Sequence, residues 1–366
     1  MTKSLVVFFF IAAAITSVSN RCDAQVVFNF DSVGSAEADN ALRLAADRWS
    51  AQFSDNITVN LDFSFADLGA GAVSGATSST QTSTFAGFRD ALGSDIQSDS
   101  DLTFQSSLPT GATFNPYINR TSEAGGPTGA DPYVDDDGGA NNSTVVLTTA
   151  NAKAIGLRAG DDAGLDGSIV FNSLPWDFDP SDGITPGTLD FVGVATHEIG
   201  HTLGFESGVD EIDSLFSLGG IGSIGGGVAL PDDNELVVTT ALDFLRFSED
   251  SVDNFADIDI TADNRNKFLS IDGGLTDLIG GGDHFSTGIN FGDGEEASHY
   301  REGIGLGVFD PNAAAGESVA ISGLDVQVLD VIGFDVAATA VPEPSMLAPL
   351  FLGLTACLIR RRGKRS

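Results

Sequence analysis

Cysteine is scarce in this chain. The 366 residues contain only two, Cys22 and Cys357, and both lie near the ends. Residues 25–340 therefore hold no disulfide bond, no thiolate metal ligand and no cysteine that could latch a metal site. A metal bound in this segment must be held by histidine and carboxylate side chains.

Lysine and arginine are also few. The chain has 17 of them against 52 aspartates and glutamates, which gives a formal net charge of -35 at pH 7. Seven of the basic and two of the acidic residues fall outside residues 25–340, which leaves 10 basic against 50 acidic residues in that segment. Such a segment repels a phosphate backbone, so the composition argues against a nucleic-acid partner.

The apolar runs near the two ends are too short to span a bilayer, which takes roughly 20 residues. Residues 1–24 place Lys3 before an apolar run at 5–15 and then small and polar residues, which is the layout of a secretory signal peptide. At the other end, Pro342-Glu343-Pro344 precedes an apolar run at 346–359 and a basic tail. The positive-inside rule predicts that this tail stays cytoplasmic until it is processed.

The C-terminal segment 341–366 resembles the PEP-CTERM sorting signal of bacterial exported proteins. The resemblance implies recognition by sorting machinery of the exosortase type, with transient membrane contact through the apolar segment. It also implies a protein exported to the bacterial cell surface, outer envelope or extracellular matrix. A permanent tail anchor is the alternative interpretation of the same segment.

Between these ends, periodicity predicts one domain of the α+β class over residues 25–340. Alternating apolar residues predict strands at 26–30, 56–65, 143–149, 166–173 and 267–274. Helical spacing predicts helices at 36–53, 84–96, 150–157, 241–248 and 322–336, and a central helix that Thr188 or Asp190 caps and Gly204 ends. The Gly- and Asp-rich segment 122–142 is predicted to be a loop.

The central helix contains the sequence His197-Glu198-Ile199-Gly200-His201. Residues four apart lie on one helix face, so the two imidazoles can bind one cation. Glu198 lies about 100° further round the helix, within reach of a water molecule beside that cation. Zinc acidifies such a water and a carboxylate can take its proton, so the motif predicts zinc-dependent hydrolysis of a peptide bond with Glu198 as general base.

The run HEIGHTLG at 197–204 resembles the metzincin zinc peptidases, whose signature is HExxHxxG. In compact members a third histidine follows the glycine closely, but here Ser207 stands at that position. In leishmanolysin-like members a long insertion precedes the third histidine, and an apolar turn containing methionine follows it. The sequence around His299 resembles that arrangement, with Phe309 in place of the methionine. The resemblance implies a metzincin-like zincin fold.

Three residues compete to be the third ligand beside His197 and His201. His299 is favoured because a glycine-rich apolar turn and a closing helix follow it along the chain. Asp210 is a legitimate zinc ligand nine residues beyond His201, and His284 is the fourth histidine of the chain. Ser207 is a poor zinc ligand.

The expected fold has a mixed twisted sheet and helices above a cleft, over about 25–204, and a long irregular lower half with a closing helix, over about 205–340. Strand 166–173 is the expected edge of the cleft, where an extended protein or peptide substrate could add as a strand. A rival interpretation is a non-catalytic metal-binding surface or matrix protein. Calcium is a further possible ligand of the acidic stretches 135–139 and 177–183.

Overall fold

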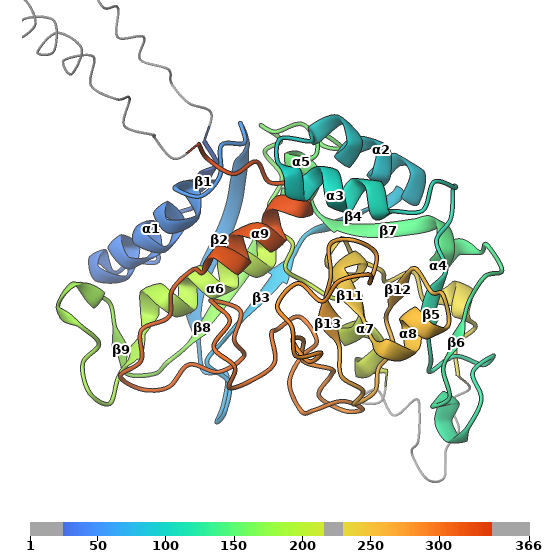
Figure 1. The fold of residues 1–366 in the computed structure, drawn as a ribbon. Coiled ribbons are helices and arrows are strands. Elements are labelled where there is room, and N and C mark those ends of the chain that lie inside the picture. Colours follow the sequence, from blue (N-terminus) through green and yellow to red (C-terminus); the bar gives the residue numbers. More distant parts are fainter. Residues whose placement is uncertain (1–24, 216–229, 339–366) are drawn as a thin grey trace, which may run out of the picture.

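The computed structural model describes residues 25–215 and 230–338 (Figure 1). The predicted signal peptide at 1–24 and the predicted sorting signal at 341–366 lie outside these residues. Within the described ranges, no helix is both long enough and apolar enough to cross a membrane.

A four-stranded sheet forms the first part of the molecule. Its strands lie in the order β1 (Val27–Asn29), β2 (Thr58–Ala66), β8 (Gly167–Asn172) and β3 (Ser74–Ser78). The first three are parallel, and β3 runs antiparallel to β8 with Ala76 opposite Ile169. The prediction that strand 166–173 forms the edge was wrong, because β3 covers it and is itself the outer strand.

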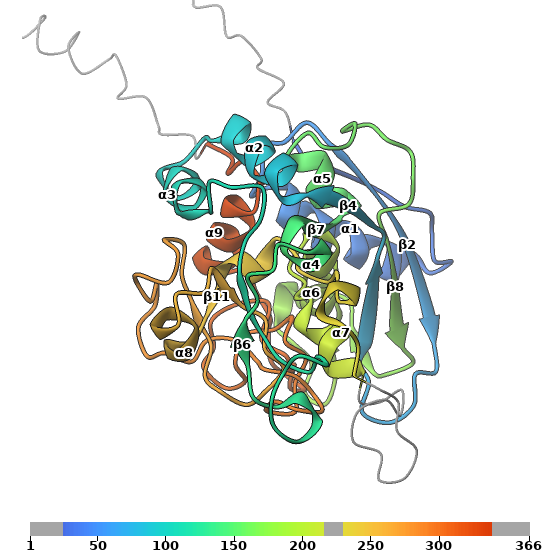
Figure 2. The same ribbon diagram turned by 90° about the vertical axis from the view of Figure 1, so that its right-hand side faces the viewer.

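Two helices pack side by side on one face of this sheet, as Figures 1 and 2 show: α1 (Ala36–Ser50) and α6 (Phe191–Leu203). Ser35 caps α1 by accepting the N–H of Ala38. The helix buries its apolar stripe, and the indole N–H of Trp49 donates to the carbonyl oxygen of Thr196 in α6 at 2.7 Å. This contact fixes the central helix against the N-terminal helix.

Smaller elements complete the part of the chain before Gly204. Strands β4 (Thr80–Thr84) and β7 (Thr144–Thr148) form an antiparallel pair. A three-stranded sheet joins β5 (Pro116–Ile118), β6 (Tyr133–Val134) and the later β12 (Ile258–Asp259). The remaining elements are α2 (Phe85–Asp95), α3 (Asp99–Ser107), α4 (Ala140–Ser143), α5 (Thr149–Ala154), β9 (Trp176–Asp177) and β10 (Leu189–Asp190), with 3-10 turns at Pro127–Gly129 and Pro180–Asp182.

The described chain after Gly204 has little regular structure. It contains α7 (Val209–Ser214), α8 (Glu249–Asp253), α9 (Gly323–Val331), β11 (Arg246–Phe247), β13 (Phe268–Leu269) and the 3-10 turns Asp233–Glu235 and Leu242–Leu245. The predicted helix at 241–248 was wrong, because a 3-10 turn leads there into β11, which pairs with β13. The α+β class is confirmed, with nine α-helices and several small sheets in the described residues.

One buried carboxyl group lies where the start of the domain meets its end. The Asp55 side chain is only 6% exposed and accepts the backbone N–H of Asp335 at 3.0 Å. Burial raises the pKa of Asp55 to about 8, and the negative charge of Asp335 adds to the effect. The folded protein therefore binds this proton more tightly than the unfolded chain, whose aspartates titrate at about 3.9.

Stability is expected to fall as the pH rises from about 4 to about 8, because ionising Asp55 costs more free energy in the folded state. Asp55→Asn keeps an acceptor for Asp335 and removes the charge. Its free energy of unfolding relative to the wild type should increase by about 1.4 kcal/mol per pH unit across that range. Denaturant unfolding of both proteins from pH 4 to pH 8 measures this difference, and a difference independent of pH would refute the assignment.

Candidate metal centre

The central helix α6 begins and ends where its sequence dictates. Asp190 is the cap, since its side chain accepts the N–H of Gly193 at 2.9 Å. Gly204 ends the helix with φ at 127°, a conformation that residues with a Cβ rarely adopt. Its apolar residues Val192, Ile199 and Leu203 are fully buried. The helix is therefore held rigidly on the sheet, and it presents His197 and His201 on one face.

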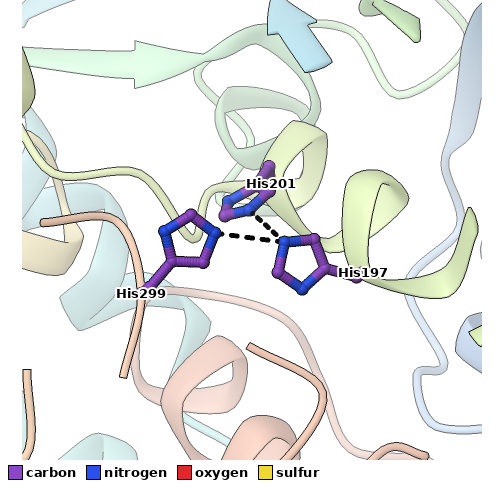
Figure 3. Close-up of side chains that lie close together, drawn as sticks. All are labelled: His197, His201 and His299. Carbon is purple, nitrogen blue, oxygen red and sulfur yellow. Dashed lines mark hydrogen bonds between the residues drawn. The ribbon is translucent and has the colours of Figure 1, made fainter. Parts of the chain in front are cut away.

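The structure brings three of the four histidines together (Figure 3). The Nε2 atom of His197 lies 3.0 Å from Nε2 of His201 and 3.1 Å from Nε2 of His299. His197 and His201 project from α6, and His299 comes from the irregular segment opposite it. The favoured third residue thus meets the helical pair, across a separation of about a hundred residues in sequence.

The other nitrogen of each ring faces a backbone carbonyl oxygen. His197 Nδ1 lies 2.7 Å from the oxygen of Val308, His201 Nδ1 lies 2.7 Å from that of Phe205, and His299 Nδ1 lies 3.3 Å from that of Glu296. A carbonyl oxygen can only accept, so each Nδ1 carries the proton of a neutral ring. The three Nε2 lone pairs are then left pointing at one another.

Burial favours the neutral form of two of these rings, His201 and His299. It lowers the pKa of His299 to about 3 and that of His201 well below its usual range, and the neighbouring histidines reinforce both shifts. Neutral imidazole is the form that binds a metal ion. Tetrahedral zinc with Zn–N distances of 2.0–2.1 Å separates its nitrogens by about 3.3 Å. The observed separations are close to this value, so the three rings fit a zinc ion.

Asp210, a rival for the third ligand position, instead holds the segment that carries His299. Its carboxylate accepts the N–H of Ala297 at 2.6 Å and the N–H of Ser298 at 3.0 Å. The Ser298 hydroxyl also donates to Asp210, and accepts the N–H of Ser207 at 2.8 Å. Asp210 and Ser207 therefore anchor the backbone next to His299 and do not join the group of three.

His284, the other rival, is buried in a structural role. Its Nδ1 accepts the N–H of Leu269 at 3.2 Å, so the proton is on Nε2, which donates to the carbonyl oxygen of Gly280 at 3.2 Å. One ring nitrogen is thus used by strand β13 and the other by the glycine-rich loop that follows it. Neither is left to bind a metal ion.

Phe309 lies directly beneath the helical pair. Its ring stacks on Phe205 with centroids 3.7 Å apart, and its centroid is 5.6 Å from that of His201. A Cβ built on Gly200 would lie 2.5 Å from two carbon atoms of this ring. Glycine at position 200 therefore leaves room for the phenyl ring, which forms an apolar floor beneath the imidazoles. Phe309 stands where the resemblance to metzincins implies a methionine.

Glu198 is held beside the three histidines by a residue that the sequence did not reveal. The Ser74 hydroxyl in β3 donates to Glu198 Oε1 at 2.6 Å. Glu198 is 6% exposed, and burial raises its pKa, while the nearby His197 opposes that shift. The edge strand thus supplies a positioning contact to the expected general base.

These residues line a cleft of about 1200 Å³ between β3 and the part of the chain after Gly204. The described lining includes eight acidic residues and no lysine or arginine. The acids are Glu198, Glu206, Asp210, Glu211, Glu295, Glu296, Asp310 and Glu317. The cleft is therefore large enough for a peptide segment, and its lining is acidic, although burial raises the pKa of Glu206 and that of Asp210 to about 7.

The acidic stretches 177–183 and 135–139, considered above as possible calcium ligands, differ in what their carboxylates contact. Asp177 and Asp179 accept backbone N–H groups of their own loop, those of Thr185 and Ser181 among them. Within the described ranges they do not gather with a third ligand. Asp135 and Asp137, in contrast, meet the distant Asp233.

Comparison with known proteins gives no further guide: no protein-family model, no curated protein and no solved structure is detectably similar to this chain.

Proposed function

We propose that this chain is a zinc-dependent endopeptidase with a metzincin-like fold and a leishmanolysin-like order of ligands. The observation that carries the proposal is the buried carboxyl group of Glu198 beside three converging imidazoles, in a cleft large enough for a peptide. The long segment between Gly204 and His299, the floor formed by Phe309 and the closing helix α9 support the same assignment.

In this proposal His197, His201 and His299 hold the zinc ion through their Nε2 atoms, and backbone carbonyl oxygens orient all three rings. A zinc ion bound there would supply Lewis acidity, which lowers the pKa of a water molecule and favours attack on a carbonyl group. Glu198 accepts the proton of the attacking water and passes it to the leaving nitrogen. Its raised pKa makes it a stronger base than an exposed glutamate.

The edge strand β3 gives an extended substrate a place to bind. Its residues Ser74, Gly75 and Ala76 line the cleft, and β8 occupies only one side of the strand. The backbone groups on the other side can pair with an added strand, which aligns a peptide along the cleft without selecting its side chains. This arrangement suits an endopeptidase.

The main alternative is a non-catalytic metal-binding surface or matrix protein. A structural metal site needs no carboxylate held by Ser74 beside its ligands, so Glu198 favours the enzyme. Casein cleavage by the purified protein, measured as isolated, after chelation and after zinc is returned, separates the two. Zinc-dependent cleavage supports the proposal, and a zinc-loaded protein that leaves casein intact would contradict it.

We also propose that the protein acts outside the cytoplasm. The signal-like segment 1–24 and the PEP-CTERM-like segment 341–366 support export, followed by processing at the envelope by machinery of the exosortase type. Contact with the membrane would then be transient.

The charge of the cleft predicts a preference for basic side chains near the scissile bond. Burial raises the pKa of Glu206 to about 7, and Asp210 and Glu296 contribute to the shift. Glu206 therefore gains its charge as the pH rises through 7, and its attraction for a lysine of the substrate should grow with it.

Two peptides that differ by one lysine or glutamine beside the cleaved bond test this preference. The lysine peptide should have the higher kcat/KM by about tenfold at pH 8, and by less at pH 6. Glu206→Gln, which keeps an acceptor for Ser78, should shrink the advantage and its pH dependence. Equal rates for the two peptides at both pH values would rule out charge selection.

A further inference from the structure

The direction of the backbone groups in β3 follows from two hydrogen bonds at its ends. The carbonyl oxygen of Val73 accepts the N–H of Asn172, and the N–H of Ser79 donates to the carbonyl oxygen of Asp166. Asn172 ends β8 and Asp166 directly precedes it, so both bonds point to the β8 side of the strand. Successive residues of an antiparallel strand turn their backbone groups to opposite sides. The odd-numbered residues between these two therefore also pair with β8.

Ser74 and Ala76 consequently present their N–H and C=O groups on the other side of β3. This side is open, because β3 is the outer strand of its sheet. Both residues line the cleft. An extended peptide that pairs with β3 must use these backbone groups, so its own backbone would be anchored at Ser74 and at Ala76.

The side chain of Ser74 has a different partner. Its hydroxyl donates to Glu198 Oε1 at 2.6 Å, and Glu198 is 6% exposed. Helix α6, which carries Glu198, packs against β3. Ser74 is thus the residue of the strand whose backbone faces the path of the substrate and whose side chain holds the expected general base.

We propose that Ser74 couples the binding of a peptide to the placement of Glu198, an inference that rests on the proposed endopeptidase function. An outer strand is held by a neighbour on one side only, so it opens more readily than an inner strand. A peptide paired with Ser74 and Ala76 holds β3 from its second side and keeps the carboxyl group beside the three histidines. Binding energy from parts of the substrate that do not react then raises kcat and does not merely lower KM.

Steady-state kinetics with a short lysine-containing peptide, and with the same peptide extended at both ends, tests this coupling. For the wild type the extended peptide should have a kcat about tenfold higher, because it reaches both anchors on β3. In Ser74→Ala the kcat for the extended peptide should fall by about tenfold or more, because Glu198 loses the donor that places it. The advantage in kcat over the short peptide should then disappear, while the lower KM remains.

Two further variants separate the hydroxyl from the strand. Ser74→Thr keeps a hydroxyl donor and suits a strand, so it should restore both kcat and the effect of peptide extension. Thr77→Ala is the matched control, since it removes a hydroxyl from an exposed position of the same strand, opposite Ser168 of β8. It should behave as the wild type does, and zinc content should be the same in all four proteins.

Amide hydrogen exchange of the zinc-free protein gives a measurement that does not depend on catalysis. The extended peptide should slow exchange at the N–H groups of Ser74 and Ala76 more than at those of Gly75 and Thr77, which β8 already protects. Equal slowing at the four positions, or none, would overturn the anchoring. Equal kcat values for Ser74→Ala and the wild type would overturn the role of Ser74 alone, whereas a zinc-loaded wild type that cleaves neither peptide would contradict the proposed function itself.

Discussion

Replacing Glu198 with glutamine is expected to abolish peptide hydrolysis while zinc remains bound. Glutamine keeps an oxygen for the Ser74 hydroxyl, so the side chain should stay in place and lose only its ability to take a proton. Loss of a general base typically lowers the rate 10²–10⁴-fold. The measurement is kcat for casein-derived peptides at equal zinc content.

Glu211→Gln provides the control for this experiment. Glu211 is another acidic residue of the cleft lining, but it is exposed and lies on α7. Its substitution removes one negative charge and should leave kcat close to the wild-type value. A zinc-loaded Glu198→Gln protein that turns over near the wild-type rate would show that Glu198 is not the base.

His299→Ala is expected to lose both zinc and activity. Loss of an outer partner of a metal ligand alone typically costs 10–100-fold in affinity, and removing one of three imidazoles should cost more than about 100-fold. The protein should still fold, because His299 lies in the cleft lining and its ring nitrogens make only two contacts at hydrogen-bond distance in the described part of the chain, to His197 Nε2 at 3.1 Å and to the carbonyl oxygen of Glu296 at 3.3 Å. Zinc stoichiometry after dialysis, together with the rate of peptide cleavage, measures the effect.

His284→Asn and Asp210→Asn test the two residues that competed with His299 as third ligand. Asparagine at 284 can accept the N–H of Leu269, so that variant should keep zinc and activity. Asparagine at 210 keeps one acceptor for the backbone beside His299 and should lose zinc affinity only partly. If His299→Ala stays loaded and active while the Asp210 variant does not, the ligand assignment is wrong.

The helical half of the site was predictable from sequence because its signals are local. The spacing of His197 and His201, the cap at Asp190 and the stop at Gly204 all act within a few turns of one helix. The place of His299 was inferred from order along the chain, and the structure brings it to the helical pair. How it is held there, by Asp210 through Ala297 and Ser298, was not foreseen, because that contact depends on tertiary packing.

The edge strand was missed, and Ser74 with it. Residues 74–84 are mostly serine, threonine and glycine, and they lack the apolar alternation that marks a strand. Their pairing with β8 and β7 comes from neighbouring strands, which sequence periodicity does not report. The same limit explains the wrong helix at 241–248, where pairing of β11 with β13 outweighed helical spacing.

Helix α3 was missed for a different reason. It buries only Phe104, so its helical periodicity is faint. A capping box holds its first turn, since Ser98 accepts the N–H of Asp101 and the Asp101 carboxylate accepts the N–H of Ser98. A local signal was therefore present in the Ser-x-x-Asp sequence, and it would have located the start of the helix.

Anomalous diffraction at the zinc absorption edge, from crystals of the zinc-loaded protein, tests the central claim most directly. The expected result is one strong peak among the Nε2 atoms of His197, His201 and His299, next to the Glu198 carboxylate. A map with no peak there, or with its zinc peak at Asp210 or His284 instead, would contradict a zinc centre completed by His299.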